Sequence, residues 1–195
     1  LGKNIHVKVI YNKENVGVIK GRNQGIKESS GRLVWFLDND QFIAPITINR
    51  YLNTKADIIG YEGWKLSLTG DWKFGPALDP KDVVTVGCGG MMVRREVFDK
   101  IGLLDEDFSP AYWEDPEFCV RALKEKFTIK LCVGHGIIHE AHTTLKPEDH
   151  LPGIERNKDL FISKVRKPTT TGNARVLVLA DNDKWAWGRK ANAYK

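Results

Sequence analysis

The sequence has little cysteine, no long apolar run and no block of basic residues. Its three cysteines, Cys88, Cys119 and Cys132, are widely spaced and odd in number, which argues against a disulfide framework or a zinc-binding pattern. We therefore expect reduced, buried thiols and a cytoplasmic protein. No apolar run approaches the roughly 20 residues that cross a bilayer, and no signal peptide opens the chain, so we expect a soluble protein.

The 195 residues carry a formal charge of +5, and the pI is near 9.0. This balance favours anionic partners such as phosphates, nucleotides or an acidic membrane surface, and hence peripheral association with the inner face of a membrane. The basic residues are dispersed along the chain, which argues against a nucleic-acid partner. A chain of this length that is 42% hydrophobic can form one domain core with additional material.

The most informative stretch is residues 33–40, where five apolar residues lead directly into Asp38 and Asp40. A short apolar run predicts a strand buried on both faces, as in the middle of a parallel sheet. Positions i and i+2 of an extended chain point the same way, so the two carboxylates would face a ligand together at the carboxyl end of the strand. The pair suits a hard divalent cation, although a plain turn would use the same residues.

The surrounding residues predict a strand, a helix and a second strand, which is the unit of a parallel sheet. Residues 5–11 alternate as a strand does, and residues 18–30 suit a surface helix that ends at Gly31. Gly17 and Arg22 lie near the helix start, where they could meet a phosphate or belong to a solvated basic face. Later elements are also expected: strands over 56–61 and 83–86, a loop or hairpin over 65–80, and helices over 94–101 and 146–167.

A second acidic group, Glu114, Asp115 and Glu117, surrounds Pro116. The Asp-Pro pair predicts a helix over 116–126 with Asp115 as its N-cap. A carboxylate at a helix start on a cleft rim can take a proton from an acceptor hydroxyl. Alternatively, these residues only stabilise the positive end of the helix.

The sequence after this helix predicts a strand that leads into a turn bearing three histidines: His135, His139 and His142. A zinc site is disfavoured because Gly134 and Gly136 would break the helix that such a spacing needs, and no cysteine pair completes the site.

Several motifs, in order and in register, resemble the family-2 glycosyltransferases with the GT-A fold. The nucleotide-sugar half is similar at Asn15-x-Gly17, Arg22-Asn23-x-Gly25-Ile26, Gly31 and Leu37-Asp38-Asn39-Asp40, and the acceptor half at 87–98, 101–106 and 112–122. The resemblance covers about residues 5–145. It implies an α/β fold with a GT-A-like mixed, mostly parallel sheet flanked by helices, of the nucleotide-diphospho-sugar transferase type.

The resemblance also implies an activity and a set of site residues. A metal-dependent, inverting enzyme would move a sugar from a nucleotide-diphosphate donor to a hydroxyl of a glycan or lipid-linked acceptor, as in polysaccharide biosynthesis. Mn²⁺ or Mg²⁺ would be held by Asp38 and Asp40 of the DXD motif together with His139. Asp115 would be the catalytic base, with Glu114 beside it, and Trp113 would stack on the acceptor sugar. The donor would contact Gly17, Arg22, Asn23, Asp38, Asn39, Gly89 and Gly90.

One departure from the family concerns the start of the chain. Such enzymes open with a strand and an acidic residue that hold the base of the nucleotide, and neither precedes Leu1. We therefore expect a GT-A-like domain over 1–145 that lacks its first strands, then a helix and linker over 146–173. The strand and helix expected over 174–195 either start another α/β unit or dock onto the first domain.

Three other functions are weighed against this one. A haloacid-dehalogenase-type phosphatase is disfavoured because Phe42 stands where that motif needs Thr or Val. A sugar nucleotidylyltransferase usually carries a Gly-rich activating loop near its N-terminus, which this chain lacks or has lost. A non-catalytic carbohydrate-binding or scaffold module would bind glycans without metal or nucleotide. The sequence specifies neither the base, the sugar, the acceptor, the linkage nor the oligomeric state.

Overall fold

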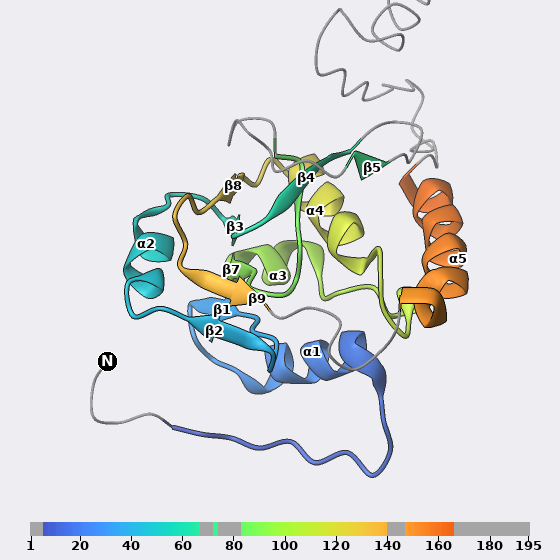
Figure 1. Cartoon of the computed structure of the whole chain (residues 1–195), viewed down its shortest axis with the longest axis horizontal. Coiled ribbons are helices and arrows are strands. Elements are labelled where there is room, and N and C mark those ends of the chain that lie inside the picture. The colour runs from blue at the N-terminus through green and yellow to red at the C-terminus, as the bar shows by residue number, and fades with distance from the viewer. Residues whose placement is uncertain (1–5, 67–71, 74–82, 140–146, 166–195) are drawn as a thin grey trace, which may run out of the picture.

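The computed structural model describes residues 6–66, 72–73, 83–139 and 147–165 of the chain. Its central four-stranded sheet has the order β1 (Leu33–Trp35), β7 (Met92–Arg94), β3 (Ile58–Gly60) and β8 (Ile129–Leu131) (Figure 1). Strand β7 is antiparallel to both neighbours, whereas β3 and β8 are parallel. Strands β1, β3 and β8 therefore share one direction, and β7 is inserted between them in the opposite one. This confirms the expected mixed, mostly parallel sheet.

Five α-helices and a 3₁₀ turn accompany the sheets in the described residues: α1 (Gly17–Glu28), α2 (Thr47–Asn53), α3 (Arg95–Ile101), η2 (Glu106–Phe108), α4 (Glu114–Lys124) and α5 (Pro147–Val165). Helix α1 buries Ile19, Asn23 and Ile26, which recur at the spacing of one helix face. Helix α4 packs against α3 and β6, and α5 packs against α4 at the edge of the molecule (Figure 1). The predicted helices over 94–101 and 146–167 correspond to α3 and α5.

Two smaller sheets lie beside the central one. Strands β2 (Gln41–Ile43) and β9 (Ile137–His139) pair antiparallel, with Gln41 opposite His139. Strand β4 (Gly63–Leu66) lies between β5 (Trp72–Lys73) and β6 (Thr85–Val86), and its pairing with β5 forms the hairpin expected in this region. The β2–β9 pair carries two segments that are far apart in the sequence to one end of β1, which is the end that bears the aspartates.

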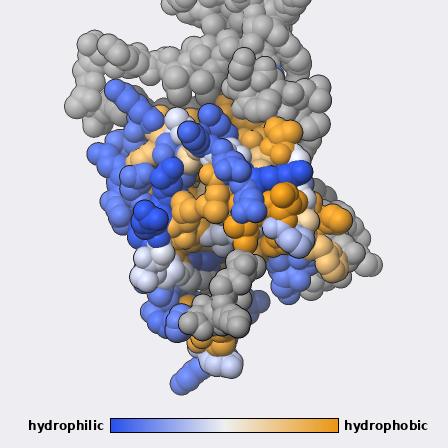
Figure 2. All heavy atoms as spheres, turned by 90° about the vertical axis from the view of Figure 1, so that its left-hand side faces the viewer, coloured by the Kyte–Doolittle hydropathy of each residue, from blue (hydrophilic) through white to orange (hydrophobic). Residues whose placement is uncertain are grey.

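The main core lies among α1, α3, α4 and the central sheet, and a second cluster is built around Tyr51. All three cysteines are buried and unpaired, as expected. Apolar side chains also gather on the face formed by α2 and the β2–β9 pair (Figure 2). Phe42 and Ile138 are cross-strand partners there and are 61% and 66% exposed. None of the described helices has the length and apolar character needed to cross a membrane.

Some local expectations were wrong. Residues 6–12 form no strand, and Val7 and Tyr11 are 80% and 89% exposed, because no described strand pairs with this segment. Strand β1 is not buried on both faces, since it lies at the edge of the described sheet. Helix α1 ends at Glu28 before Gly31 is reached, and the Ser29 hydroxyl bonds to the Ile26 carbonyl. The segment expected over 174–195 lies outside the described residues, so the domain boundaries stay predictions.

Candidate active site

Three predicted metal ligands converge at the carboxyl end of β1. Asp38 and Asp40 follow β1 after two intervening residues, and His139 ends β9, which pairs with β2 immediately after the aspartates. One ligand atom from each residue lies within 4.8 Å of the other two. Backbone hydrogen bonds from Phe36 to Met91 and from Gly90 to Phe36 continue the β1–β7 contact toward this point. The β2–β9 register, with Gln41 opposite His139, therefore places His139 beside Asp38 and Asp40.

The side chains at this point have the chemistry of a cation site. Asp40 Oδ1 is buried, and no residue in the described part of the chain donates a hydrogen bond to it. It lies 3.1 Å from Nε2 of His139. A buried carboxylate oxygen without a donor is costly unless a cation satisfies it. Two carboxylates and an imidazole therefore fit a divalent metal such as Mn²⁺.

Tyr61 and Glu62 support the histidine, and sequence reasoning missed both. The Tyr61 hydroxyl lies 3.0 Å from Nδ1 of His139 and 3.1 Å from Oε1 of Glu62. The hydroxyl has one proton, and a carboxylate can only accept, so the hydroxyl donates to Glu62 and accepts from Nδ1–H of His139. Nε2 of His139 then keeps its lone pair and faces Asp40, as a metal ligand must. Tyr61 and Glu62 follow β3 and His139 ends β9, so only the tertiary structure reveals this chain of hydrogen bonds.

Arg22 of α1 joins this site to the second acidic centre. One guanidinium nitrogen lies 2.9 Å from Oδ1 of Asp38, and another lies 3.2 Å from Oε1 of Glu114. The second oxygen of Glu114 is buried and has no hydrogen-bond partner among the described residues. Arg22 is therefore the cation that Asp38 and Glu114 share.

Helix α4 begins two residues earlier than expected. Tyr112 and Trp113 adopt the left-handed conformation, with φ of 77° and 73°, and Trp113 occupies the N-cap position in place of Asp115. Glu114 and Asp115 thus lie in the first turn, where Pro116 is tolerated because its missing N–H has no partner inside the helix. The acidic side chains face the positive end of the helix.

The environment of Asp115 favours its protonated form. Protein atoms exclude most of the water near this carboxyl group although part of the residue stays accessible, and this burial raises its pKa to about 8. The Glu114 carboxylate acts in the same direction, while Arg22 and the backbone N–H of Cys88 oppose it. Burial also raises the pKa of Glu114, and the Arg22 charge opposes that shift. A carboxyl group with such a pKa is a candidate general base.

The backbone at Gly89 and Gly90 lies close to two side chains of the site, Asp38 and Tyr61. A Cβ atom at Gly89 would lie 2.3 Å from Oδ2 of Asp38, and one at Gly90, where φ is 89°, would lie 2.6 Å from the Tyr61 ring. An open depression of about 510 Å³ lies alongside. Its lining combines the start of α1 with the end of β1: Val18, Gly21, Arg22, Leu37, Asp38, Asn39 and Asp40. Gly17 adjoins this lining at the first position of α1.

Two predicted site residues are placed elsewhere. Asn23 is 2% exposed and exchanges hydrogen bonds with the backbone of Leu104, so it ties α1 to a loop and does not face the depression. Trp113 is 4% exposed, and its ring packs 5.1 Å from that of Phe161, so its faces are not available for stacking on a sugar. Both positions are buried because later elements cover them, which local sequence patterns do not encode.

Of the other two histidines in the predicted turn, His135 lies in the described part of the chain. The His135 ring packs against Tyr61, and its Nδ1 accepts a hydrogen bond from the Ile137 backbone. His142 lies outside the described residues.

The sequence of this chain is similar to those of known glycosyltransferases. The sequence model described as Glycosyl transferase family 2 matches residues 2–58, which include α1, β1 and both aspartates. This segment of the chain is therefore similar to family 2 of the glycosyltransferases, and the mixed α/β fold is consistent with that similarity. The chain is also similar to the uncharacterized glycosyltransferase YwdF of Bacillus subtilis (strain 168), with 30% identity over 138 residues. That match covers 61% of this chain and 49% of the relative, so the chain spans about half of the relative's length.

Proposed function

We propose that this chain catalyses metal-dependent, inverting transfer of a sugar from a nucleotide-diphosphate donor to a hydroxyl group of a glycan or lipid-linked acceptor. The observation that carries the proposal is the junction at Arg22, which joins Asp38 of the three-residue cation site to Glu114, the neighbour of Asp115, whose pKa is raised. One half of this arrangement suits a diphosphate, and the other half suits a hydroxyl that must lose its proton.

The donor half consists of Asp38, Asp40 and His139, which would hold Mn²⁺ or Mg²⁺. When bound, the ion offsets the negative charge that develops on the departing diphosphate. Arg22 can add a hydrogen-bonded positive charge on the same side, because its guanidinium already reaches Asp38. We keep Gly17, Asn39, Gly89 and Gly90 as proposed donor contacts, whereas Asn23 is assigned a structural role.

The acceptor half depends on Asp115. Its raised pKa gives the ionised carboxylate a high affinity for a proton, which is what abstraction from a hydroxyl requires near neutral pH. Glu114, held by Arg22, raises that pKa further and is itself in reach of the same region. A displacement that uses a base and no protein nucleophile inverts the anomeric carbon.

The proposed setting follows from composition and surface. The net charge of +5 and the exposed apolar pair Phe42 and Ile138 support peripheral association with the cytoplasmic face of a membrane, where a lipid-linked acceptor would be found. Polysaccharide biosynthesis is the proposed context, and no nucleic-acid partner is proposed.

The direct test is an assay of nucleoside-diphosphate release from a panel of sugar nucleotides with Mn²⁺, in the presence and absence of candidate glycan acceptors. We expect release from one donor, stimulation by an acceptor, and loss of activity in EDTA that added Mn²⁺ restores. Activity that is unchanged in EDTA would contradict metal dependence. Incorporation of pyrophosphate would indicate a nucleotidylyltransferase, and glycan binding without turnover would indicate a non-catalytic module.

The support of His139 by Tyr61 leads to a separate prediction. Tyr61→Phe removes the hydroxyl that receives Nδ1–H, so the ring loses its fixed tautomer, and we expect Mn²⁺ affinity to fall by about 10–100-fold. Isothermal titration with Mn²⁺ measures this without turnover. Tyr11→Phe is the matched control, because Tyr11 is 89% exposed. Equal Mn²⁺ affinity in the two variants would remove Tyr61 from this role.

A further inference from the structure

The chain that leads into α4 is folded around one side chain from α5. Asn157 is fully buried, and its Nδ2 lies 2.6, 2.8 and 3.0 Å from the carbonyl oxygens of Phe108, Ala111 and Tyr112. An amide nitrogen has two protons, so three carbonyl groups converge on two donors. Such convergence requires a tight fold of residues 108–112, which lie just before Glu114 and Asp115 at the start of α4.

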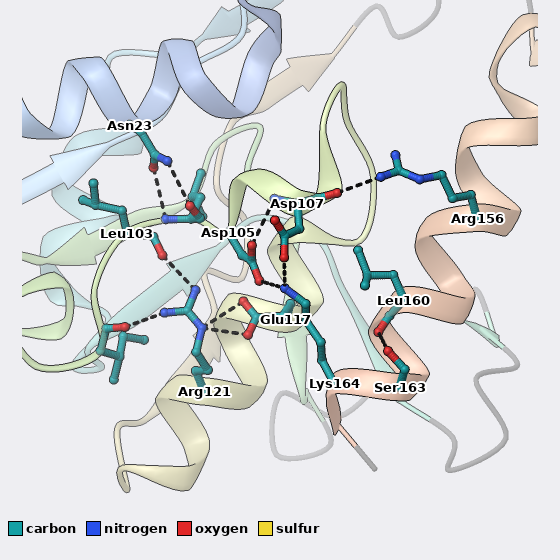
Figure 3. A network of polar contacts seen from close by, with 12 residues as sticks. Asn23, Leu103, Asp105, Asp107, Glu117, Arg121, Arg156, Leu160, Ser163 and Lys164 are labelled. Carbon is teal, nitrogen blue, oxygen red and sulfur yellow. Dashed lines mark hydrogen bonds and ion pairs between the residues drawn. The ribbon is translucent and has the colours of Figure 1, made fainter. Parts of the chain in front are cut away.

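Other side chains of α5 hold the same segment. Arg156 donates to the carbonyl groups of Ser109 and Asp107, at 2.9 and 3.1 Å. Lys164 forms ion pairs with Asp105 and Asp107 (Figure 3). The Phe161 ring packs on Trp113. Asn157, Phe161 and Lys164 recur at the spacing of one helix face, and all three contact residues within 105–113.

Helices α1 and α4 contact residues 103–106, at the start of the same stretch of chain. Asn23 of α1 bonds to Leu104 and Glu106, and Arg121 of α4 bonds to the carbonyl of Leu103 while it pairs with Glu117 (Figure 3). With α5 on one side and α1 and α4 on the other, the segment has little freedom to move. Two successive non-glycine residues in the left-handed region, Tyr112 and Trp113, are retained only where surrounding contacts determine them.

We propose that α5 is a positioning element of the active site, and that Asn157 is its principal positioning residue. By fixing the carbonyl groups of residues 108–112, Asn157 sets the left-handed turn at Tyr112 and Trp113 and hence the direction in which Asp115 leaves the first turn of α4. The proposal rests on the proposed function for its catalytic consequence. It assigns a role to a helix that sequence patterns separate from the catalytic domain.

The test compares Asn157→Ala with Ile162→Ala in the full chain. Ile162 is a partly buried residue of α5 that packs against the core, so its truncation lowers the stability of the helix without removing a hydrogen bond to the segment. We expect Asn157→Ala to lower kcat by about 10²-fold, because displacement of a catalytic group by about 1 Å has that effect. The Kd for Mn²⁺ with a nucleoside diphosphate should change by less than about twofold. Ile162→Ala should retain kcat at a temperature where both variants are folded.

Hydrogen exchange provides a readout that does not need turnover. In Asn157→Ala, the amides of residues 108–115 should exchange at least about tenfold faster, while those of β1 and β7 keep their protection. Equal exchange in wild type and variant, or equal kcat in the two α5 variants, would overturn the proposal. If Asn157→Ala does not fold, Arg156→Ala, which removes two exposed hydrogen bonds to the same segment, should produce the same changes at smaller size. Absence of turnover in the wild type would instead overturn the proposed function, and the exchange result would still decide the positioning role.

Discussion

Asp115→Asn is expected to lower turnover by roughly 10²–10⁴-fold, which is the usual contribution of a general base, while binding of metal and nucleoside diphosphate persists. The amide keeps the shape of the side chain and cannot accept the proton of the acceptor hydroxyl. The measurement is kcat at saturating donor, together with Kd for the nucleotide. Asp99→Asn, at an exposed position of α3, makes the same chemical change away from the site and should leave both values unaltered. Near-normal turnover in Asp115→Asn would exclude Asp115 as the base.

The raised pKa of Asp115 adds a pH dependence to the same variant. Burial and the Glu114 charge raise this pKa to about 8, whereas an aspartate in an unfolded chain titrates near about 4. Between these values the folded protein binds a proton that the unfolded chain releases, so this group makes the protein less stable as pH rises from about 4 to about 8. Asp115→Asn removes the titrating group and therefore removes this decrease in stability with rising pH. The variant should therefore be more stable than wild type at pH 8, and chemical denaturation should show the difference shrinking toward pH 5.

Wild-type activity, unlike stability, should increase as Asp115 ionises. Because the base must be deprotonated to act, kcat/KM should rise with pH and level off above about 8. The small residual activity of Asp115→Asn should lack this rise. A wild-type profile that is flat between pH 6 and 9 would contradict a base with a raised pKa.

Asp40→Ala is expected to abolish the metal-dependent binding of the nucleotide. A ligand that binds only the folded state adds about 2.7 kcal/mol at 100 times its Kd, which appears as a clear rise in Tm. For wild type with Mn²⁺ and a panel of nucleoside diphosphates, we expect one base to raise Tm and the others to have smaller effects. Asp40→Ala should show no rise with any of them, since it removes the buried oxygen that faces His139.

The control for this experiment is Asp99→Ala, which removes a carboxylate from an exposed helical position. It should keep the full shift. The variant Asp40→Ala should also be at least as stable as wild type without ligands, because a buried carboxylate oxygen without a hydrogen-bond donor is lost. A shift in wild type that needs no metal, or one that survives in Asp40→Ala, would overturn the assignment of the cation site.

Local sequence patterns predicted the parts of the site that depend on neighbouring residues. The apolar run before Asp38 and Asp40 leads to the depression that these aspartates line, and the helical spacing of Ile19 and Ile26 identifies the buried face of α1. The same reasoning failed for residues 5–11, because an alternating pattern becomes a strand only when another strand supplies its hydrogen bonds. It also placed the start of α4 two residues late, because local patterns do not encode the left-handed turn at Trp113, whose ring packs on Phe161 of α5.

The sequence by itself determined that two carboxylates share one side of a strand end and that acidic residues begin a later helix, because side-chain direction follows from backbone periodicity alone. Only the tertiary structure decided that Arg22 bridges Asp38 to Glu114, a residue 92 positions away, and that Asn23 and Trp113 are buried. It likewise decided that the Tyr61 hydroxyl, just after β3, lies within hydrogen-bond distance of His139 at the end of β9. Contacts of this kind depend on how several elements pack together, and packing is a property of the whole fold that no single segment encodes.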